Sequence, residues 1–413
     1  MGMKPFVVSR RVFSGLALGS LFGCDEQPKT RQIESTPPVI TSAQPKSMTS
    51  AETPTEAPAR SSLPLFRAYP SLQQRLAHAA LGEYPTPIEK AERLGNRIGV
   101  PNLWIKRDDL SGKLYGGGKT RKLEFYLAEA KMRGATEIVT FGAYGSNQAV
   151  ATALWGRALG FSVRLMLAPQ MPSEYVKKNL FAMQKAGAVI EVVHDGVGAA
   201  EARMLEVLAQ RKNRVTYLIP AGGSSPLGNL AFVNAALELA DQVRRGDCPA
   251  PDCIYMAMGT MGSVVGMALG LALTDLPTEL IAVRASSAET SSEARFWRLA
   301  KETIAYMRSL DSVFESLKID RRRIRFQTRQ LGGGYGFPTQ AGAKAMHAFD
   351  EELGYSLEPT YTAKAFAALM SETKRLADKN VLFWNSHNTR AIDTDGIGPD
   401  DFGNELHDYL KAM

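Results

Sequence analysis

The chain has 413 residues, of which 45% are hydrophobic and 22% are charged, and its formal net charge is +7. This length predicts two lobes and additional segments rather than one small core. A positive charge would suit nucleic acid or a membrane surface, but no run of Lys and Arg is interleaved with aromatic residues, which argues against nucleic-acid binding. We interpret the densest basic segment, 321–325, as a solvated helix end or loop.

Residues 1–24 have the organisation of an export signal. The pattern Ser-Arg-Arg-x-Phe at 9–13 resembles a twin-arginine signal, and the apolar run at 16–22 is too short to span a bilayer. Leu-x-Gly-Cys at 21–24 resembles a bacterial lipobox, which predicts cleavage before Cys24 and lipidation of its thiol. We therefore expect an exported, periplasmic lipoprotein held to the membrane only by its lipid anchor; the alternative is a plain secretory signal with a cysteine by chance.

Residues 25–62 are rich in Pro, Thr, Ser, Ala and Gln and contain few large apolar side chains. Such a segment cannot bury enough apolar surface to fold. We expect it to be a disordered linker between the membrane anchor and a folded enzyme.

The other two cysteines, Cys248 and Cys253, lie close together in the sequence Cys-Pro-Ala-Pro-Asp-Cys. A zinc site needs two further ligands, and none follows nearby, so we expect no metal centre. A disulfide closing this short loop would suit an oxidising compartment, but two unpaired thiols are the interpretation that we favour.

Strand-like and helix-like segments alternate through most of the remaining chain, after an entry segment at 63–75. Alternation of this length predicts an α/β fold with a parallel sheet. The predicted strands are 103–107, 137–141, 162–167, 189–193, 216–219, 252–258, 280–284 and 381–384. The predicted helices are 88–98, 120–133, 148–159, 175–186, 198–211, 227–243 and a segment ending at 273, followed by a charged and largely helical region at 287–325 and two helices after 338.

Three glycines at 116–118 place Lys119 at the start of a predicted helix. Glycine allows a tight backbone and the close approach of a ligand, so the lysine could bind a phosphate, attack a carbonyl carbon or simply be solvated. A phosphate-binding P-loop requires a glycine six residues before the lysine, but Lys113 occupies that position, which excludes this ATPase motif.

The segment Gly-Thr-Met-Gly-Ser at 259–263 lies between a predicted strand and a predicted helix. Its glycine spacing does not fit a dinucleotide-binding motif. Small residues at a helix start nevertheless expose backbone N–H groups, and the helix dipole attracts an anion. The segment is either a phosphate cradle or a tight strand–helix turn.

A reactive lysine together with a separate phosphate cradle suggests pyridoxal phosphate. The aldehyde of this cofactor needs an amine, its phosphate needs a dipolar cradle, and its ring nitrogen needs a partner on the far side. Lys119 and the segment 259–263 could supply the first two.

The sequence also resembles the D-cysteine desulfhydrase and 1-aminocyclopropane-1-carboxylate (ACC) deaminase family. GGGKTRKLE at 116–124 is similar to the family motif Gly-Gly-Asn-Lys-x-Arg-Lys-Leu-Glu, and SNQ at 146–148 is similar to Ser-Asn-His/Gln. GGS at 222–224 and GGYGFP at 333–338 resemble two further family segments. The resemblance covers roughly residues 84–388.

The resemblance implies a pyridoxal phosphate enzyme of fold type II, similar to tryptophan synthase β, with two lobes and a three-layer α/β/α architecture. It implies a large cofactor-binding domain, 63–119 with 222–413, and a small domain, 120–221. It also implies a homodimer.

By the same resemblance, the site residues take defined roles. Lys119 would hold the cofactor and move protons, Ser146 would bind the substrate carboxylate and Tyr335 would face the substrate; these three are the predicted catalytic residues. The predicted cofactor contacts are Asn147 at the ring hydroxyl, Ser386 at the ring nitrogen, and Gly259, Thr260, Met261, Gly262 and Ser263 at the phosphate, and Asn147 and Gln148 would also contact the substrate. The structural alternatives are a helix cap for Ser146 and Asn147, a core position for Tyr335 and a loop hydroxyl for Ser386.

Four departures from the family pattern bear on the substrate. Gly118 replaces the asparagine before the lysine, Met261 is bulkier than the family residue, and Gly334 stands where ACC deaminases carry a glutamate that contacts the ring nitrogen. Asn-Ser-His-Asn at 385–388 replaces a His-Thr-Gly-Gly segment. Loss of the glutamate favours elimination over ring opening.

We therefore predict a pyridoxal-phosphate-dependent lyase or deaminase that acts on a small amino acid. The leading expectation is a D-cysteine desulfhydrase, which releases sulfide, ammonia and pyruvate by α,β-elimination. An ACC deaminase is the first alternative, and an exported amino-acid-binding lipoprotein without catalysis is the second.

Overall fold

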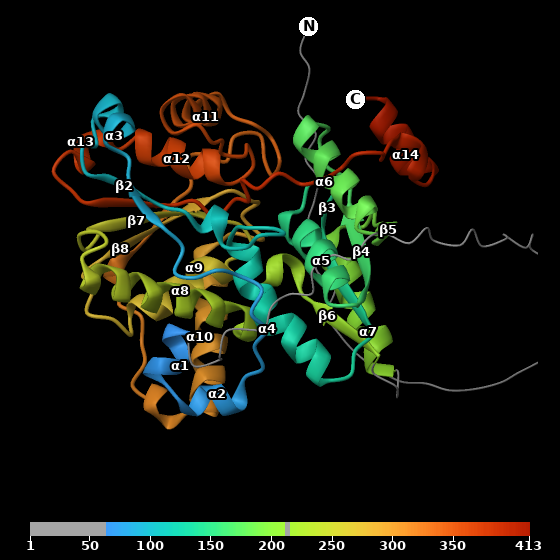
Figure 1. Cartoon of the computed structure of the whole chain (residues 1–413), viewed down its shortest axis with the longest axis horizontal. Coiled ribbons are helices and arrows are strands. Elements are labelled where there is room, and N and C mark those ends of the chain that lie inside the picture. Colours follow the sequence, from blue (N-terminus) through green and yellow to red (C-terminus); the bar gives the residue numbers. More distant parts are fainter. Residues whose placement is uncertain (1–62, 211–214) are drawn as a thin grey trace, which may run out of the picture. The chain divides into compact units, whose positions relative to one another are not determined.

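The computed structural model describes residues 63–210 and 215–413 (Figure 1). The predicted signal, Cys24 and the predicted linker at 25–62 lie outside the described residues. Over the part of the chain that the structure describes, no helix has both the length and the apolar character to cross a membrane.

Within residues 63–210 and 215–413 the strands form two sheets, of which the larger has six strands in the order β1-β2-β10-β7-β8-β9. Neighbouring strands are parallel, except that β1 pairs antiparallel with β2. The strands are β1 (Ile88–Lys90), β2 (Leu103–Lys106), β7 (Cys253–Met258), β8 (Glu279–Arg284), β9 (Ile324–Gln327) and β10 (Val381–Trp384).

Helices cover both faces of the six-stranded sheet. Successive side chains of each strand point to opposite faces, so apolar strands present a face to each layer of helices. Ile254 and Met256 belong to a core with α8 (Pro226–Arg245), α9 (Gly262–Leu271) and α10 (Glu293–Leu310). Cys253 and Tyr255 belong to a second core with α3 (Glu92–Ile98), α11 (Gln340–Leu353) and α12 (Thr362–Met370). Figure 1 shows α11 and α12 on one side of this sheet and α8 and α10 on the other.

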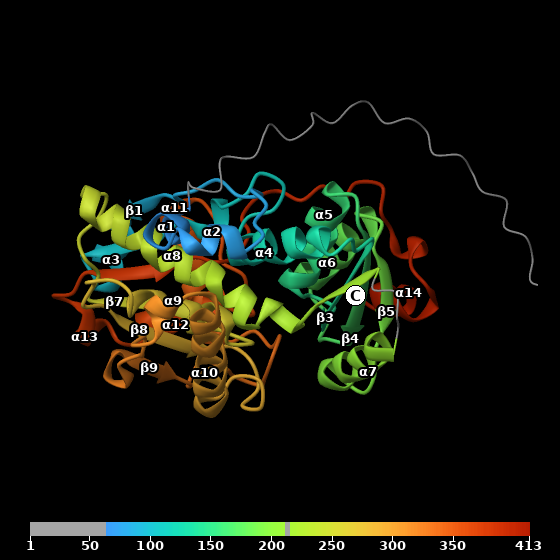
Figure 2. The same ribbon diagram turned by 90° about the horizontal axis from the view of Figure 1, so that it is seen from below.

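The second sheet is all parallel and has the order β5-β4-β3-β6. Ile138 and Leu165 pack with α4 (Gly118–Met132), α5 (Asn147–Ala158) and α6 (Glu174–Lys185), whereas Val139 and Phe141 pack on the face covered by α7 (Val197–Gln210). Figure 2 shows α5 and α6 on one side of these strands and α7 on the other. The strands are β3 (Glu137–Ala143), β4 (Ser162–Ala168), β5 (Val189–Val192) and β6 (Thr216–Ile219).

Helix α4 contributes to the cores of both sheets. Phe125 packs in the core of the six-stranded sheet, while Leu123 and Leu127 pack in the core of the four-stranded sheet. The start of α4 therefore lies where the two cores meet. The predicted division into a large and a small domain stays a prediction.

Two of the predicted elements differ from the structure. The helix predicted at 88–98 is wrong in its first turn, because Ile88–Lys90 forms β1 and pairs with β2. The helical region predicted at 287–325 is limited to α10, and its end forms the short edge strand β9, which pairs with β8. Long-range pairing decides both segments over local propensity. The sequence analysis also missed α1 (Pro64–Ala68), α2 (Ser71–Arg75) and α14 (Asn404–Lys411), and the short α13 (Thr373–Leu376) completes the helices.

The two cysteines follow the predicted interpretation, whereas the basic segment forms the short 3₁₀ turn Arg321–Arg323 and the first two residues of β9 rather than only a solvated helix end or loop. Cys248 and Cys253 are buried, unpaired thiols. In the basic segment, Arg321 lies 4.3 Å from the ring centre of Trp297, and the other arginines bind acidic side chains or carbonyl groups of the same fold.

A buried network of charges joins β2 and α8 to α4. Glu238 accepts hydrogen bonds from Lys106 Nζ at 2.7 Å and from Arg121 Nη1 at 2.9 Å, and Arg121 Nε donates to Asp108 Oδ1 at 2.8 Å. Burial alone would raise the pKa of Glu238, but attraction to Arg121 and Lys106 lowers it to about 2. The carboxylate is therefore charged at neutral pH and compensates two buried cations.

We expect Glu238→Gln to lower the free energy of unfolding by about 3–5 kcal/mol at neutral pH, because the buried cations lose their compensating charge. The loss should shrink as the pH falls from 4.5, the ordinary pKa of a glutamate, toward about 2, since the parent carboxylate is then protonated as well. Denaturant unfolding of both proteins at several pH values measures the difference. Glu83→Gln is the control: Glu83 forms an exposed ion pair with Lys113, and its replacement should change the free energy of unfolding by about 1 kcal/mol or less. A loss of stability for Glu238→Gln that does not vary with pH would contradict the prediction.

Candidate functional site

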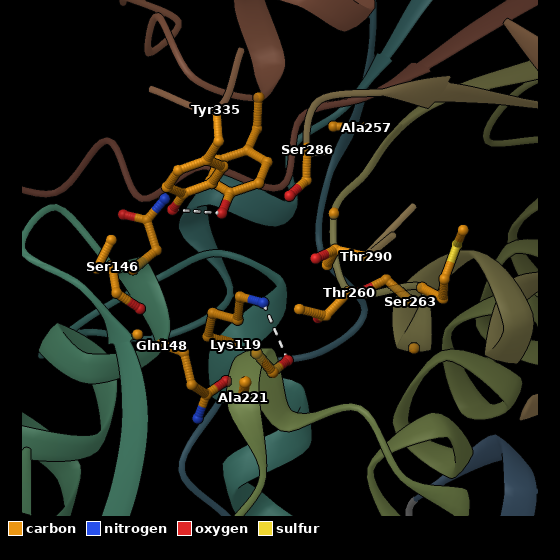
Figure 3. A pocket seen from close by; sticks show the side chains of 18 of the residues that line it. Lys119, Ser146, Gln148, Ala221, Ala257, Thr260, Ser263, Ser286, Thr290 and Tyr335 are labelled. Atoms are coloured by element: carbon orange, nitrogen blue, oxygen red, sulfur yellow. Dashed lines mark hydrogen bonds between the residues drawn. The ribbon is translucent and has the colours of Figure 1, made fainter. Parts of the chain in front are cut away.

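A cavity of about 500 Å³ lies where α4 and α5 begin and β7 ends (Figure 3). Every site residue predicted from the sequence within the described part of the chain lines it. These residues are Lys119, Ser146, Asn147, Gln148, Gly259, Thr260, Met261, Gly262, Ser263, Tyr335 and Ser386. The structure thus brings segments from both sheets to one place.

The glycines before Lys119 are packed directly against neighbouring backbone. A Cβ atom on Gly116 would lie 1.8 Å from the carbonyl oxygen of Asp109. Gly117 has φ of +83°, and a Cβ there would lie 2.6 Å from the carbonyl oxygen of Ser386. The N–H of Gly118 donates to the same carbonyl at 3.1 Å. These contacts require glycine at 116 and 117 and fix Lys119 in the first turn of α4.

Two lysines of α4 share one carbonyl group. Lys119 Nζ donates to the oxygen of Gly222 at 3.1 Å, and Lys122 Nζ donates to it at 3.0 Å. Burial lowers the pKa of Lys119 to about 8, and burial together with the charge of Lys119 lowers the pKa of Lys122 well below its usual value. Among the residues that the structure describes, neither amine is paired with a carboxylate. Lys119 is thus a candidate nucleophile and base.

The segment 259–263 forms the strand–helix junction that the sequence predicted, and Met261 has φ of +80°, which is rare for a residue other than glycine. The N–H of Gly262 donates to Ser224 Oγ at 3.0 Å, and Ser224 Oγ lies 2.7 Å from Thr260 Oγ1. A Cβ on Gly262 would lie 2.9 Å from Lys122 Nζ, so this amine reaches the start of α9.

A phosphate fits this junction. It offers hydroxyl groups, the N–H groups of a helix start and an uncompensated amine. Lys122 was not identified from the sequence as a possible phosphate ligand, although its position three residues after Lys119 predicts that both side chains lie on the same face of the helix. The bulk of Met261 is accommodated because its side chain is only 2% exposed and packs in the core of the larger sheet.

The start of α5 combines a helix cap with cavity-lining side chains. Ser146 is the N-cap, and its Oγ accepts from the N–H of Ala149 at 3.3 Å. Asn147 Oδ1 accepts hydrogen bonds from the hydroxyl groups of Tyr115, at 3.1 Å, and Tyr175. The buried Oε1 of Gln148 has no hydrogen-bond partner in the described structure. Ser146 is thus a helix cap, as the structural alternative predicted. Because Ser146 also lines the cavity, its predicted contact with the substrate stays a prediction.

Tyr335 lies opposite Lys119 across the cavity (Figure 3). Its hydroxyl oxygen accepts from Tyr361 Oη at 2.8 Å, and burial raises the pKa of Tyr335 to about 12, so the phenol is protonated at neutral pH. Lys364 Nζ donates to the carbonyl groups of Leu331 and Gly334 at 2.9 and 3.1 Å and thereby holds the glycine-rich loop that carries Tyr335. Tyr361 and Lys364 were not identified from the sequence.

The cavity contains a carboxylate that the sequence analysis did not foresee. Gly334 offers none, but Glu358 lines the cavity, and burial raises its pKa. Its oxygens accept from the N–H groups of Thr360 at 2.8 Å and of Tyr361 and Thr362 at 2.7 Å. This carboxylate is therefore engaged by the turn that begins α12.

Ser386 directly follows β10 and lines the cavity. Its carbonyl group binds the glycine loop, while its hydroxyl group has no hydrogen-bond partner within residues 63–210 and 215–413. The hydroxyl group is therefore available to a ligand, and its role at a ring nitrogen stays a prediction. No cluster of His, Cys, Asp and Glu that could hold a metal ion occurs in the described residues.

Residues 79–386 match the family described as pyridoxal-phosphate dependent enzyme. A nocardicin C-9' epimerase from Nocardia uniformis subsp. tsuyamanensis is 33% identical over 311 residues, which cover 74% of this chain and 91% of the relative. A D-cysteine desulfhydrase from Serratia proteamaculans (strain 568) is 32% identical over 313 residues, 73% of this chain and 90% of the relative. The solved structure of an ACC deaminase homologue superposes with a TM-score of 0.66 at 28% identity, covering 77% of this chain and 93% of that chain.

The chain belongs to the family of pyridoxal-phosphate dependent enzymes. Its architecture is the fold type II that the sequence predicted, with two α/β sheets that are each covered by helices on both faces. The paired amines, the phosphate-binding junction and the free hydroxyl of Ser386 fit the cofactor of this family.

The space beside Gly118 is filled by an aromatic ring. A Cβ at this position would lie 2.7 Å from Phe232 Cζ, and the Phe232 ring is fully buried. The asparagine of the family motif therefore has no room here.

We expect Gly118→Asn to lower the free energy of unfolding by about 1–3 kcal/mol through overpacking. The cost should be smaller in a Phe232→Leu background, because leucine lacks the clashing atom. A double-mutant cycle by thermal unfolding measures this coupling. Gly403→Asn is the matched control, since Gly403 has φ of −62° and a Cβ atom there would have no heavy atom within 4 Å. Additive effects of the two core substitutions would show that Phe232 does not occupy the asparagine space.

Proposed function

We propose that the protein is a pyridoxal-phosphate-dependent lyase that eliminates a β-substituent from a small amino acid, in the manner of a D-cysteine desulfhydrase. With D-cysteine and water, the products are pyruvate, ammonia and hydrogen sulfide. The observation that carries the proposal is the cavity in which Lys119, with a pKa of about 8, faces the protonated hydroxyl of Tyr335. The similarity to D-cysteine desulfhydrase supports the choice of substrate.

When bound, pyridoxal phosphate supplies an electron-withdrawing ring that acidifies the Cα proton of an amino acid. Lys119 would bond the cofactor, and Lys122, whose amine shares the Gly222 carbonyl with Lys119, would compensate its phosphate. Lys119 Nζ then takes the Cα proton, for which its lowered pKa is suited. Tyr335 Oη, oriented by Tyr361, donates a hydrogen bond to the sulfur that leaves Cβ. Ser146 and the first N–H groups of α5 hold the substrate carboxylate.

Two related activities compete with elimination. ACC deaminase activity is supported by the similarity to an ACC deaminase homologue, but Ser386 would give the ring nitrogen a neutral partner, which favours elimination. Epimerisation at Cα is supported by the similarity to nocardicin C-9' epimerase and by Lys119 and Tyr335 on opposite sides of the cavity. Lys119, retained at the site, argues against an amino-acid-binding protein without catalysis.

We expect the purified full chain to show the visible absorption band of lysine-bound pyridoxal phosphate and to form pyruvate and sulfide from D-cysteine. Lys119→Ala should remove the band and lower kcat by about 10²–10⁴-fold or more, since the amine is both the attachment point and the base. Lys113→Ala, which changes an exposed lysine near the same loop, is the control and should change neither.

A panel of D- and L-cysteine, D-serine and ACC separates the alternatives. Oxobutyrate from ACC would identify a deaminase, and loss of optical rotation without keto acid would identify an epimerase. A parent protein without the absorption band would refute the use of the cofactor, and a band without any product would favour the binding protein.

We also propose that the protein is exported by the twin-arginine route, anchored through Cys24 and assembled as a homodimer, as the sequence resemblances imply. The twin-arginine route carries folded proteins, which suits an enzyme that binds its cofactor on folding. Replacing Arg10 and Arg11 by lysine should keep the protein inside the cell, as measured by fractionation of a host with this route, and Cys24→Ser should abolish labelling by a radioactive fatty acid. Export that continues with the paired lysines would refute the route.

A further inference from the structure

His387 lines the same cavity and has no role in the steps described above. It follows Ser386 after the end of β10. Neither ring nitrogen has a hydrogen-bond partner in the parts of the chain that the structure describes, and Nδ1 is buried. Burial and, secondarily, the charge of Lys178 lower the pKa of His387 to about 3. The imidazole is therefore neutral at neutral pH and offers one N–H donor and one acceptor.

The imidazole lies beside Tyr175, the second residue of α6. Its ring centroid is 5.9 Å from that of Tyr175, at an interplanar angle of 59°. The hydroxyl of Tyr175 in turn donates to Asn147 Oδ1, and Asn147 is the first residue of α5. His387 thus approaches the end of the cavity at which Ser146 caps α5, although it belongs to a loop of the other sheet.

The charges at this end of the cavity favour an anion. Lys178 lies on α6, three residues after Tyr175, and the start of α5 adds the positive end of a helix dipole. Two carboxylates line the cavity: Glu358 accepts three backbone N–H hydrogen bonds, and Glu201 accepts one from Ala221. A neutral imidazole beside a cation has nothing to bind here until an acceptor with negative charge arrives.

We propose that His387 is a substrate-binding residue whose imidazole N–H donates a hydrogen bond to the α-carboxylate of the amino acid, beside Ser146 and the first N–H groups of α5. This inference rests on the proposed function, because that function supplies the carboxylate. It assigns a recognition role to a side chain at a position where the family pattern has glycine.

The test compares two ligands that have no leaving group at Cβ, D-alanine and D-alaninamide, which differ in the charge of the carboxyl group. The holoenzyme is titrated with each, and Kd is read from the change in cofactor absorption. A hydrogen bond to a charged group predicts that His387→Gly weakens D-alanine binding by about 10–100-fold and weakens D-alaninamide binding much less, because a neutral carbonyl group accepts a weaker hydrogen bond than a carboxylate. His387→Asn, which keeps a neutral N–H donor, should restore part of the difference, and His194→Gly, at an exposed histidine, should have no effect. Equal weakening of both ligands, or of neither, would overturn the proposal.

A second measurement protects the test against a variant that fails to fold. In the parent holoenzyme, the ¹⁵N resonances of His387, assigned by their loss in His387→Asn, should shift with D-alanine and shift less with D-alaninamide. Resonances that do not respond to D-alanine would also refute the proposal. Failure of the proposed function is recognised separately, by a missing cofactor band or by the absence of product from every amino acid in the panel.

Discussion

The position of the reactive lysine depends on a carboxylate buried among cations. Glu238 of α8 binds Lys106 of β2 and Arg121 of α4, and all three side chains are at most 2% exposed. Because a buried charge without a partner is very unfavourable, these three elements can pack together in only one arrangement. Arg121 is two residues after Lys119, so the same interaction that joins the larger sheet to α4 also positions the amine of Lys119.

The glycine loop completes this placement from the other side. Backbone contacts with the Asp109 and Ser386 carbonyl groups leave no room for side chains at 116 and 117, and the ring of Phe232 fills the space beside 118. Helix α4 then packs into the cores of both sheets. Apolar packing and buried charge pairs therefore both contribute to the position of Lys119 at the junction of the two cores.

The sequence predicted most of the fold because the parallel strands are buried apolar runs between clear helices, as at 137–141 and 252–258. It failed at β1 and β9, which are short edge strands whose identity depends on partners far along the chain. The motif residues Lys119 and Ser146 were placed in one cavity, but Glu358 and Tyr361 were not foreseen. Glu358 and Tyr361 reach the cavity through the turn before α12 and through a hydrogen bond to the loop that carries Tyr335. No local sequence pattern predicts these contacts.

The two buried thiols have a chemical consequence for an enzyme that would release sulfide. Burial raises the pKa of Cys248 to about 11 and that of Cys253 to about 12, so almost none of either residue is thiolate at neutral pH. The thiolate is the form that attacks disulfides and is oxidised by peroxides. Burial and the low thiolate fraction therefore slow the reaction of both cysteines with disulfides and peroxides.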